Sequence, residues 1–408
     1  MTTVPRAPAL LLNLAHALDH LFLLVFATAV GAIALDFRVA HWEDLMPYTT
    51  GAFVMFGFAS LPAGRLGDLW GRRRMMLIFF FGLGLSAFGV ALARSPLEIG
   101  VALTVMGLFT AIYHPVGIPM LLEFTRQPGL TIGINGLVGN LGIAVAAVST
   151  GLLVDAFGWR WAFVVPGVVC LLTGVAFAIL APRESAAPGM RKVQHRALPR
   201  PLVVRILVIM VLTATTGSLI FNFTTNGNGQ LLAQRLNGIV GDPARLGMLL
   251  AGVYTAASFA QLIVGRLIDR VPMRPLFLAI AIAQVLVFAV AAQASGWTWY
   301  VLAIVYMMVV FAAIPFSDAI VARYIDDSIR SRVSGLRLTI SFGISSIAVW
   351  ALGPIVKAAG FTVLLAAMAG VAALTALTVL WLPSAAQLSD GERSAVADPN
   401  AGGAAVPG

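Results

Sequence analysis

The chain has 408 residues, of which 60% are hydrophobic and 11% are charged, whereas a soluble domain carries about 25% charged residues. This composition excludes an ordinary soluble domain and predicts a protein that crosses a lipid bilayer many times. The net charge of +9 does not indicate nucleic-acid binding, because most basic residues lie in short loops between apolar runs. The single cysteine, Cys170, excludes an internal disulfide and a cysteine-based metal cluster.

Twelve apolar runs are long enough to cross a bilayer, and each is expected to be helical because a span must satisfy its own backbone hydrogen bonds. In chain order they cover residues 9–35, 46–64, 75–94, 97–122, 130–156, 160–181, 202–234, 245–266, 273–294, 297–322, 332–356 and 361–383. Residues 182–201 predict a basic, proline-rich linker, and residues 384–408 predict a disordered tail. The predicted organisation is six helices over 1–181, the linker, and six helices over 202–383.

A charged turn after the second run recurs in a shorter form after the eighth run. Residues 64–74 read GRLGDLWGRRR, and residues 265–270 read GRLIDR, at an offset of 201. Residues 109–112 (FTAI) and 311–314 (FAAI), in the fourth and tenth runs, match at an offset of 202. Two matches at nearly one offset predict two bundles related by an axis along the membrane normal, an arrangement found in one large class of secondary transporters.

The distribution of positive charge predicts the orientation in the membrane. With the N-terminus inside, the outer side receives only Arg38, Arg94, Arg160, Arg235, Arg245 and Lys357. Both termini, the linker and the charged turns are therefore expected in the cytoplasm. The N-terminus shows no clear cleavable signal, and the first apolar run is long enough to span. We expect the two bundles to face each other across a central cavity.

The first charged turn resembles the signature G-x-x-x-D-R/K-x-G-R/K-R/K of the major facilitator superfamily. The matching positions are Gly64, Asp68, Gly71, Arg72 and Arg73, whereas Leu69 replaces the usual base. Residues 155–163 also resemble a segment of that superfamily. The resemblance implies an all-α membrane protein with twelve transmembrane helices, arranged as two six-helix bundles about a pseudo-two-fold axis. It also implies transport by alternating access.

Three shorter motifs in the first half resemble the fosmidomycin-resistance type of exporter. They are residues 16–19 (HALD, against H-A-L-N-D), residues 113–115 (YHP, against F-H-P) and residues 139–142 (GNLG, against G-G-N-F-G). This resemblance implies proton-coupled export. Helix 5 departs from the superfamily's antiporter pattern, because Gly142 is followed by Ile143 where that pattern has a proline. The direction of transport therefore stays open.

The charged turn is a candidate gate. The superfamily resemblance implies that Asp68 contacts the inner start of the eleventh helix, where the helix dipole favours a carboxylate. Arg72 is placed to reach Glu123 at the inner end of the fourth helix. We expect these three residues, with the hinge glycines Gly64 and Gly71, to hold the outward-open state closed on the inside. Asp68→Asn is then expected to lower transport without abolishing membrane insertion.

The first apolar run carries His16, Asp19 and His20, whose spacings of three and four place them on one helical face. Asn13 extends this face towards the inside. An ionisable side chain inside a span is expensive to bury and is a functional candidate by default. Histidine exchanges protons near neutral pH, so Asp19 with His16 or His20 is a candidate proton-carrying pair. The alternative is a packing network in which these polar groups satisfy each other.

His114 lies in the fourth run beside Pro115, which frees a backbone carbonyl and bends a helix. We expect His114 to face the cluster on the first helix; the alternative is a satisfied histidine at a kink. Together with His16, His20 and Asp19 it offers residue types that ligate zinc. No H-E-x-x-H pattern is present, so neither a metal site nor a cofactor is expected.

The seventh run contains residues 222–230 (NFTTNGNGQ). Asn222, Asn226 and Gln230 are four apart and form one amide stripe, which suits hydrogen bonding to a polar substrate. The glycines predict a broken helix near the outer half, either as part of a substrate site or as a flexible outer gate. The expected substrate site also includes Asn13, Asn140, Tyr254 and Asp318.

Arg337, near the inner start of the eleventh run, has three interpretations: a topological charge, an ion-pair partner of Asp318, or a gate residue that meets Asp68. Arg73 and Arg74 are interpreted as charges that set topology only. An ionisable residue such as Asp318, inside the tenth run, is harder to explain by topology.

Three functions remain open from the sequence. The first is a proton-coupled exporter of small organic molecules or drugs, the second a proton-coupled uptake symporter for a small polar or anionic solute, and the third a non-transporting receptor or scaffold. An enzyme is not expected, because no nucleophile elbow or phosphate loop appears. Acids lining the cavity would favour cationic cargo and bases anionic cargo. We expect a monomer in a bacterial inner membrane, whose partners are the substrate, protons and lipid, with no nucleic acid.

Overall fold

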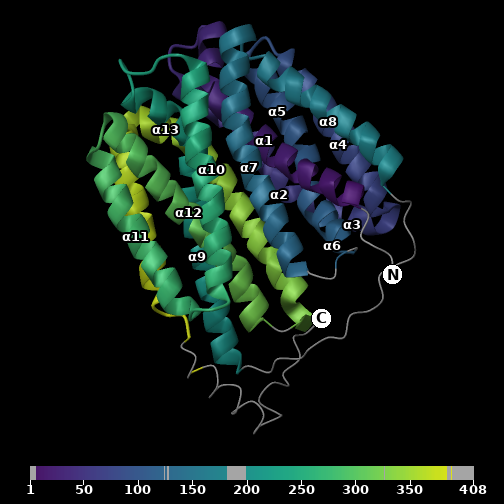
Figure 1. The fold of residues 1–408 in the computed structure, drawn as a ribbon, viewed down its shortest axis with the longest axis vertical. Helices are drawn as coiled ribbons and strands as arrows, with labels where there is room; N and C mark the ends of the chain where they lie inside the picture. The colour runs from purple at the N-terminus through teal and green to yellow at the C-terminus, as the bar shows by residue number, and fades with distance from the viewer. Residues whose placement is uncertain are drawn as a thin grey trace.

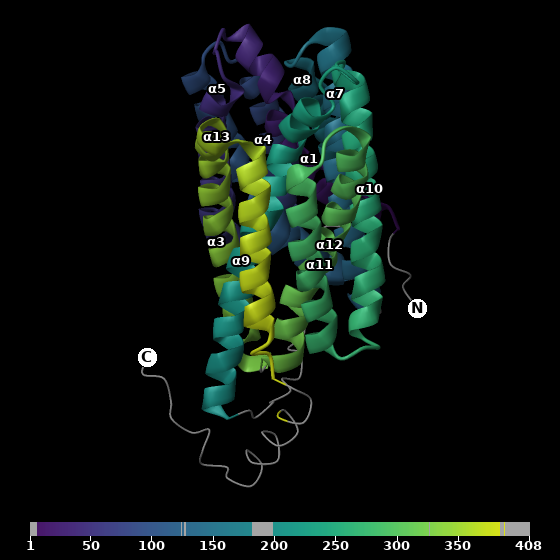
Figure 2. The same ribbon diagram turned by 90° about the vertical axis from the view of Figure 1, so that its left-hand side faces the viewer.

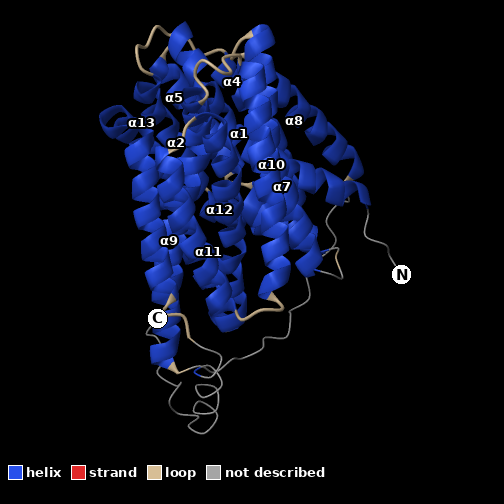
Figure 3. Cartoon of the chain, turned by 60° about the vertical axis from the view of Figure 1, so that its left-hand side comes forward, coloured by secondary structure: helices blue, strands red, loops and turns tan. Residues whose placement is uncertain are grey.

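The computed structural model describes residues 6–123, 125, 128–181, 199–325, 327–383 and 387, nearly all of which are helical (Figure 1). The described part of the chain contains no strand (Figure 3). The fold class is therefore all-α, as the hydropathy predicts. Nearly all of the predicted tail and of the predicted linker lie outside the described residues.

The first half begins with a long helix and includes two short irregular elements. Its elements are α1 (Arg6–Asp36), η1 (Trp42–Thr49), α2 (Thr50–Phe58), α3 (Ser60–Trp70), α4 (Arg72–Ala91), α5 (Pro96–Thr110), η2 (Tyr113–Gly117), α6 (Ile118–Glu123), α7 (Pro128–Phe157) and α8 (Trp161–Leu180). The second half has fewer and longer elements. They are α9 (Arg200–Arg235), α10 (Pro243–Ile268), α11 (Met273–Gln293), α12 (Gly296–Tyr324) and α13 (Asp327–Val379).

Within the described residues, 10 helices are long and apolar enough to cross a membrane. Two features account for the difference from the twelve predicted spans. α13 contains two helices that meet at Gly360, whose φ of 75° is not helical. The second predicted span is divided at Ala59 into α2 and α3, so neither piece reaches spanning length. The multi-pass membrane fold is established, and the count of twelve stays a prediction.

The glycines of the charged turn allow close packing and a sharp change of direction. A Cβ added at Gly64 would lie 3.3 Å from the Cβ of Pro115, and one added at Gly67 would lie 3.0 Å from Val116. α3 therefore packs tightly against the irregular segment η2. Gly71 joins α3 to α4 with a φ of 95°, a conformation that favours glycine. Gly71 therefore makes the turn between the two helices, whereas Gly64 lies within α3; their role as a hinge stays a prediction.

The two halves meet most extensively along a seam where α7 lies against α10 (Figure 2). They also meet along a second seam, where α2 and η1 lie against α13, and less extensively where α1 lies against α9. At the first seam, a Cβ on Gly247 would lie 2.6 Å from the carbonyl oxygen of Ala147. At the second seam, a Cβ on Gly57 would lie 2.8 Å from the Cβ of Phe342. Small residues thus let the helices of the two halves approach closely.

The seventh predicted span does not contain the expected break. α9 is one continuous helix of 36 residues from Arg200 to Arg235. A Cβ on Gly227 would lie 3.4 Å from Leu352, and one on Gly229 would lie 3.8 Å from the backbone of Thr28. These glycines therefore serve helix packing, and the prediction of a broken helix is wrong.

One end of the molecule is tied across the two halves. We call it the outer end, following the predicted orientation. Lys357 Nζ lies 2.6 Å and 2.7 Å from the two carboxylate oxygens of Asp44. Trp42 stacks on Phe361 with ring centroids 6.1 Å apart and an interplanar angle of 13°. The segment η1 therefore links the first half to α13 at the outer end.

At the opposite, inner end, the described polar contacts of the charged turn stay inside the first half. Arg72 forms an ion pair with Glu123, and Arg73 donates to the backbone carbonyl of Ala178 at 2.5 Å. These contacts join the charged turn to α6 and α8. Among the described contacts, the pair of Asp44 with Lys357 crosses between the halves at the outer end, and the pairs of Arg72 and Arg73 stay within the first half.

Candidate functional site

A cavity of about 290 Å³ lies between the two halves. Its polar lining comes from α1, η2 and α7 in the first half and from α9, α11, α13 and neighbouring residues in the second. The polar residues that line the cavity include His20, His114, Asn140, Asn222, Asn226, Gln284 and Arg337. Its aromatic lining consists of Phe53, Phe56, Phe221, Phe277 and Phe342. The cavity is therefore mainly apolar, with a few polar groups at fixed positions, as is usual for small-molecule sites.

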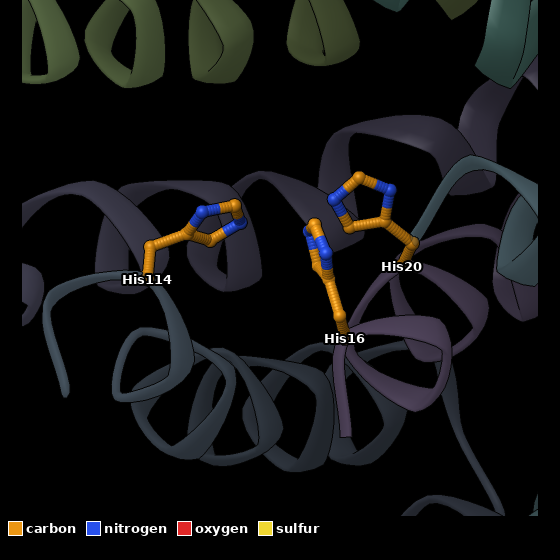
Figure 4. Close-up of side chains that lie close together, drawn as sticks. All are labelled: His16, His20 and His114. Carbon is orange, nitrogen blue, oxygen red and sulfur yellow. The ribbon is translucent and has the colours of Figure 1, made fainter. Parts of the chain in front are cut away.

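Three histidines meet at the first-half wall of this cavity (Figure 4). His16 and His20 come from α1, and His114 comes from η2. The ring of His16 lies edge-on to both others, with centroid distances of 4.6 Å to His20 and 5.1 Å to His114. His20 and His114 are 5.9 Å apart. The predicted meeting of His114 with the cluster on the first helix is present in the structure.

The ring of His16 is held by the fifth span. Its Nδ1 lies 2.8 Å from the backbone carbonyl oxygen of Asn135, and since a carbonyl only accepts, Nδ1 carries the hydrogen. The Asn135 side chain donates to Asn13 Oδ1 at 2.9 Å and to the Tyr113 hydroxyl at 2.7 Å. Tyr113 in turn stacks on His16 at 4.7 Å. Asn13 thus belongs to a hydrogen-bond network that supports the histidine cluster, and it does not line the cavity.

Asp19 is fully buried behind the histidines, with 0% of its surface exposed. Neither of its carboxylate oxygens has a hydrogen-bond partner within the described structure. Its nearest ion-pair contact runs from Oδ2 to His114 Nε2, at 3.5 Å. A buried carboxylate without hydrogen bonds is expensive unless it is neutralised. This carboxylate therefore requires a cation or a proton from its surroundings.

His114 is presented to α1 by an irregular turn. α5 ends at Thr110, and residues 113–117 form the π-helical turn η2. Pro115 lacks a backbone N–H, which leaves the carbonyl of Ala111 without its helical donor. The hydroxyl of Ser60 donates to that carbonyl at 3.2 Å. The sequence predicted this bend from the proline, and π-helical turns are frequent at functional sites.

On the second-half wall, amides and hydroxyls lie beside a single ionisable residue, Arg337, among the described lining residues. Asn222 donates to Ser345 Oγ at 2.8 Å, and Asn226 donates to the backbone carbonyl of Asn222 at 3.1 Å. The side-chain oxygen of Asn226 is buried without a described partner. Both asparagines line the cavity. This wall therefore offers neutral hydrogen-bonding groups to a substrate.

The other residues expected at a substrate site lie in different places. Gln230 is not among the lining residues and lies against Gly31 of α1. Tyr254 is fully buried, and its hydroxyl donates to the carbonyl of Thr225 at 2.9 Å, so it supports α9 from behind. Asn140 lines the cavity and donates to Gln261, a hydrogen bond that joins the two halves.

The gate residues form a cluster within the first half. Arg72 pairs with Glu123 as expected, and Arg72 Nη2 lies 3.9 Å from Asp68 Oδ1. The Asp68 side chain is 76% exposed, so it has little contact with the rest of the protein. The expected contact of Asp68 with the inner start of the eleventh helix falls mostly on residues whose side chains the structure does not describe.

Arg337 takes the second of its three sequence-based interpretations. Its Nη2 lies 2.7 Å from Asp318 Oδ1, so these two residues form an ion pair within the second half. Arg337 lines the cavity, and its Nε is buried without a described partner. Asp318 is 69% exposed and is absent from the described lining of the cavity.

Sequence reasoning did not single out several residues of the site. Asn135, Ser345 and Gln284 are polar residues within apolar runs, and that placement was the available signal. The ion pair between Asp44 and Lys357 joins residues 313 positions apart. Each of those two charges looks like an ordinary loop residue in the sequence, so no local pattern pointed to their contact.

The fold and the cavity define a membrane transporter whose two halves enclose a central site. The chain belongs to the Major Facilitator Superfamily, whose family model matches residues 10–232, more than half of the chain. A solved D-xylose–proton symporter superposes with a TM-score of 0.75 over 93% of this chain and 97% of that one. The sequence identity is 13%, so this likeness shows the fold alone.

Two curated relatives are similar over parts of their length. The puromycin resistance protein pur8 of Streptomyces alboniger is 30% identical over 138 residues, which is 33% of this chain and 27% of that protein. The tetracenomycin C resistance and export protein of Streptomyces glaucescens is 31% identical over 169 residues, which is 40% of this chain and 31% of that protein. The match thus spans less than a third of either relative.

Proposed function

We propose that this protein is a proton-coupled exporter of small organic molecules in a bacterial inner membrane. The observation that carries the proposal is the central cavity, whose first-half wall holds His20 and His114 in front of the Asp19 carboxylate, which has no described hydrogen bond. A buried carboxylate of this kind needs a neutralising cation, and a proton that enters from one side and leaves on the other meets that need once in each transport cycle.

The conformation supports alternating access. At the outer end, the pair of Asp44 with Lys357 and the stacking of Trp42 on Phe361 close the two halves together. At the inner end, the pair of Arg72 with Glu123 stays within one half. We infer an inward-facing state, in which a cytoplasmic solute reaches the cavity. Proton binding at Asp19 from the outside would accompany release of the solute there.

The remaining assignments follow from this scheme. The first bundle over residues 1–181 carries the cation site, and the second over 202–383 orients the substrate through Asn222 and Asn226. Both termini lie in the cytoplasm. In the outward-open state Asp68 moves against the inner start of α13 and closes the inner end, with Arg72 and Glu123 holding the charged turn in shape.

Export is favoured over uptake by the relatives. The names of both curated proteins describe them as resistance proteins, and one of the names also includes export. The apolar and aromatic lining of the cavity suits a drug-like organic molecule better than a sugar or an inorganic ion. The similarity to the fosmidomycin-resistance type supports the same direction, and a single substrate does not follow from it.

Uptake by proton symport is the second candidate. Arg337 lines the cavity and has a buried Nε without a described partner, which would suit an anionic solute. The fold neighbour described above is named as a proton symporter. The absence of the antiporter proline after Gly142 is consistent with this candidate as well.

Transport in oriented membrane vesicles separates the two candidates. A panel of labelled cationic, neutral and anionic organic compounds is offered to everted and to right-side-out vesicles carrying an imposed proton gradient. An exporter accumulates a compound in everted vesicles with an acidic interior. Accumulation confined to right-side-out vesicles with an acidic exterior would establish the symporter instead.

A further inference from the structure

The histidine cluster has the composition and spacing of a metal site. His16, His20 and His114 each offer one ring nitrogen, and these nitrogens all lie within 4.8 Å of one another. Two of the ligand atoms come from one face of α1 and the third from η2, so the set joins two spans. In a zinc site with bonds of about 2.0–2.1 Å, neighbouring ligand nitrogens lie about 3.4 Å apart. Ring rotations that bring the nitrogens closer by up to about 1.4 Å would complete the geometry.

The position of the hydrogen on the neutral His16 ring prepares this residue to act as a ligand. Its Nδ1–H donates to the carbonyl of Asn135, which leaves the lone pair on Nε2. That atom is buried and has no described hydrogen-bond partner, and the same holds for Nδ1 of His20. A metal-bound histidine almost always donates its other ring N–H to a carbonyl or carboxylate in this way. Nδ1 of His16 is thus fixed by its hydrogen bond, while Nε2 stays free to bind a cation.

The surroundings supply the fourth ligand and the charge balance. Asp19 Oδ2 lies 3.5 Å from His114 Nε2 and has no hydrogen bond in the described structure. One carboxylate and three neutral imidazoles form a ligand set with a single negative charge, which suits a divalent ion in a membrane. The nearby guanidinium of Arg337 is already neutralised by Asp318 at 2.7 Å.

We propose that His16, His20 and His114 bind one divalent transition-metal ion of the zinc class, with the carboxylate of Asp19 as the fourth ligand. Imidazole ligands favour zinc, cobalt, nickel and copper over magnesium and calcium. His20 and His114 line the central cavity, so the ion enters from there and exchanges with the solution. It occupies the lone pairs that a proton would use, and bound metal therefore blocks coupled transport.

A neighbouring glycine makes room for this arrangement. A Cβ added at Gly139 would lie 2.5 Å from Cε1 and 2.7 Å from Nε2 of His16. Alanine at this position would force the His16 ring to move while all three histidines and Asp19 remain. The Gly139→Ala variant thus tests the geometry of the site separately from its chemical composition.

Binding of Co²⁺ tests the proposal directly, because its visible absorption reports coordination number. The full-length protein is purified in detergent through a tag without histidine, stripped of metal, and titrated with Co²⁺. We expect the intense absorption of a four-coordinate nitrogen and oxygen site at one equivalent, and its loss when Zn²⁺ is added. The single thiol, Cys170, is buried in α8, where it donates to the backbone carbonyl of Phe80, so no thiolate charge-transfer band is expected.

Matched variants assign the signal to residues. Single His16→Gln, His20→Gln and His114→Gln changes should abolish the four-coordinate absorption. Gly139→Ala should weaken Co²⁺ binding by about tenfold or more, as for a displaced ligand shell. The exposed His41, on the outer loop, is the control, and His41→Gln should bind Co²⁺ as the unchanged protein does.

Two results would overturn the proposal. One is the absence of a four-coordinate Co²⁺ spectrum in the monodisperse, folded wild-type protein. The other is an unchanged spectrum in a folded histidine variant, which would place the metal elsewhere. The proposal goes beyond the proposed function and is tested without transport, so metal binding by a protein that moves no proton would leave it standing. Proton-coupled transport by a protein that binds no Co²⁺ would remove only the metal site.

Discussion

The polar groups in the two halves of this transporter differ in kind. At the cavity, the first half contributes a cluster of ionisable groups, in which Asp19 and His16 carry buried atoms that lack described hydrogen bonds. In the second half the buried polar residues are amides and hydroxyls, most of which bond to backbone carbonyls and some to one another. Asn222 donates to Ser345 at 2.8 Å, and Tyr306 donates to Asn228 at 2.6 Å. Unpaired ionisable groups exchange cations, whereas paired neutral groups hold a shape.

The internal repeat makes the difference explicit. The offset of 202 that aligns residues 109–112 with residues 311–314 also aligns His114 with Phe316. Phe316 is fully buried and stacks on Phe277 with centroids 4.2 Å apart. The repeated helix therefore holds an exchangeable group in one half and an inert aromatic ring in the other. In the proposed scheme, the duplicated scaffold would support two roles, with cation handling in the first half and substrate orientation in the second.

Replacing His114 by its counterpart breaks the comparison most severely. His114→Phe converts the first half to the chemistry of the second, and it removes the group that contacts Asp19. We expect transport driven by a proton gradient to fall to background. The protein should still fold, because Phe56 and Phe342 already pack around this ring at 5.8 Å and 6.3 Å. Vesicle transport is the measurement, with the exposed His41→Phe as control, and undiminished transport by His114→Phe would show that the first half does not handle the cation.

A smaller effect on transport is expected from a substitution in the second half. Asn222→Ala removes a cavity-lining amide, and losing one hydrogen bond to the substrate should weaken apparent affinity by about tenfold, or about 1.4 kcal/mol. The stoichiometry of protons to substrate should not change. Gln230→Ala is the matched control, because Gln230 shares the amide stripe and is not a lining residue. Equal losses of affinity in both variants would contradict the assignment of the substrate to the asparagine wall.

Substitutions at the two ends should shift the conformational equilibrium in opposite directions. These shifts should be the smallest of the predicted effects. Lys357→Ala removes the outer ion pair, whose side chains are 45% and 46% exposed. Such a pair contributes about 0.2–1 kcal/mol, so the outer-closed population should fall by at most about fivefold. Asp68→Asn should raise that population, because it weakens the inner closure of the alternative state. Distances between spin labels at the two ends measure the shift, and displacement in the same direction by both variants would contradict the gate assignment.

The sequence predicted the membrane fold because every span must be apolar enough to lie in the bilayer. The hydropathy set the number and order of most apolar helices, and Pro115 indicated the bend that presents His114. The break expected in the seventh span, α9, was wrong, because Gly227 and Gly229 allow close contact with Leu352 and Thr28. Glycine in a span signals both a break and close helix packing, and only the position of the neighbouring helix separates these meanings.

The partners of each site residue could not be predicted from the sequence alone. His16 meets the carbonyl of Asn135, which is 119 residues away, and the rotation of one helix against another decides such a contact. The same limit applies to the metal site. Two histidines at spacing four on α1 are only a permissive pattern, and the third ligand, His114, is supplied by a π-helical turn on another span.

The most direct test of the account is substrate-dependent proton flux in proteoliposomes. The purified protein is reconstituted, a compound identified in the vesicle screen is added, and an internal pH dye reports proton movement. We expect the wild-type protein to move protons only with substrate, and Asp19→Asn to move none while keeping its fold and its cavity. Movement of substrate without protons by the wild-type protein, at the same rate in Asp19→Asn, would contradict the claim that the first half couples transport to a proton.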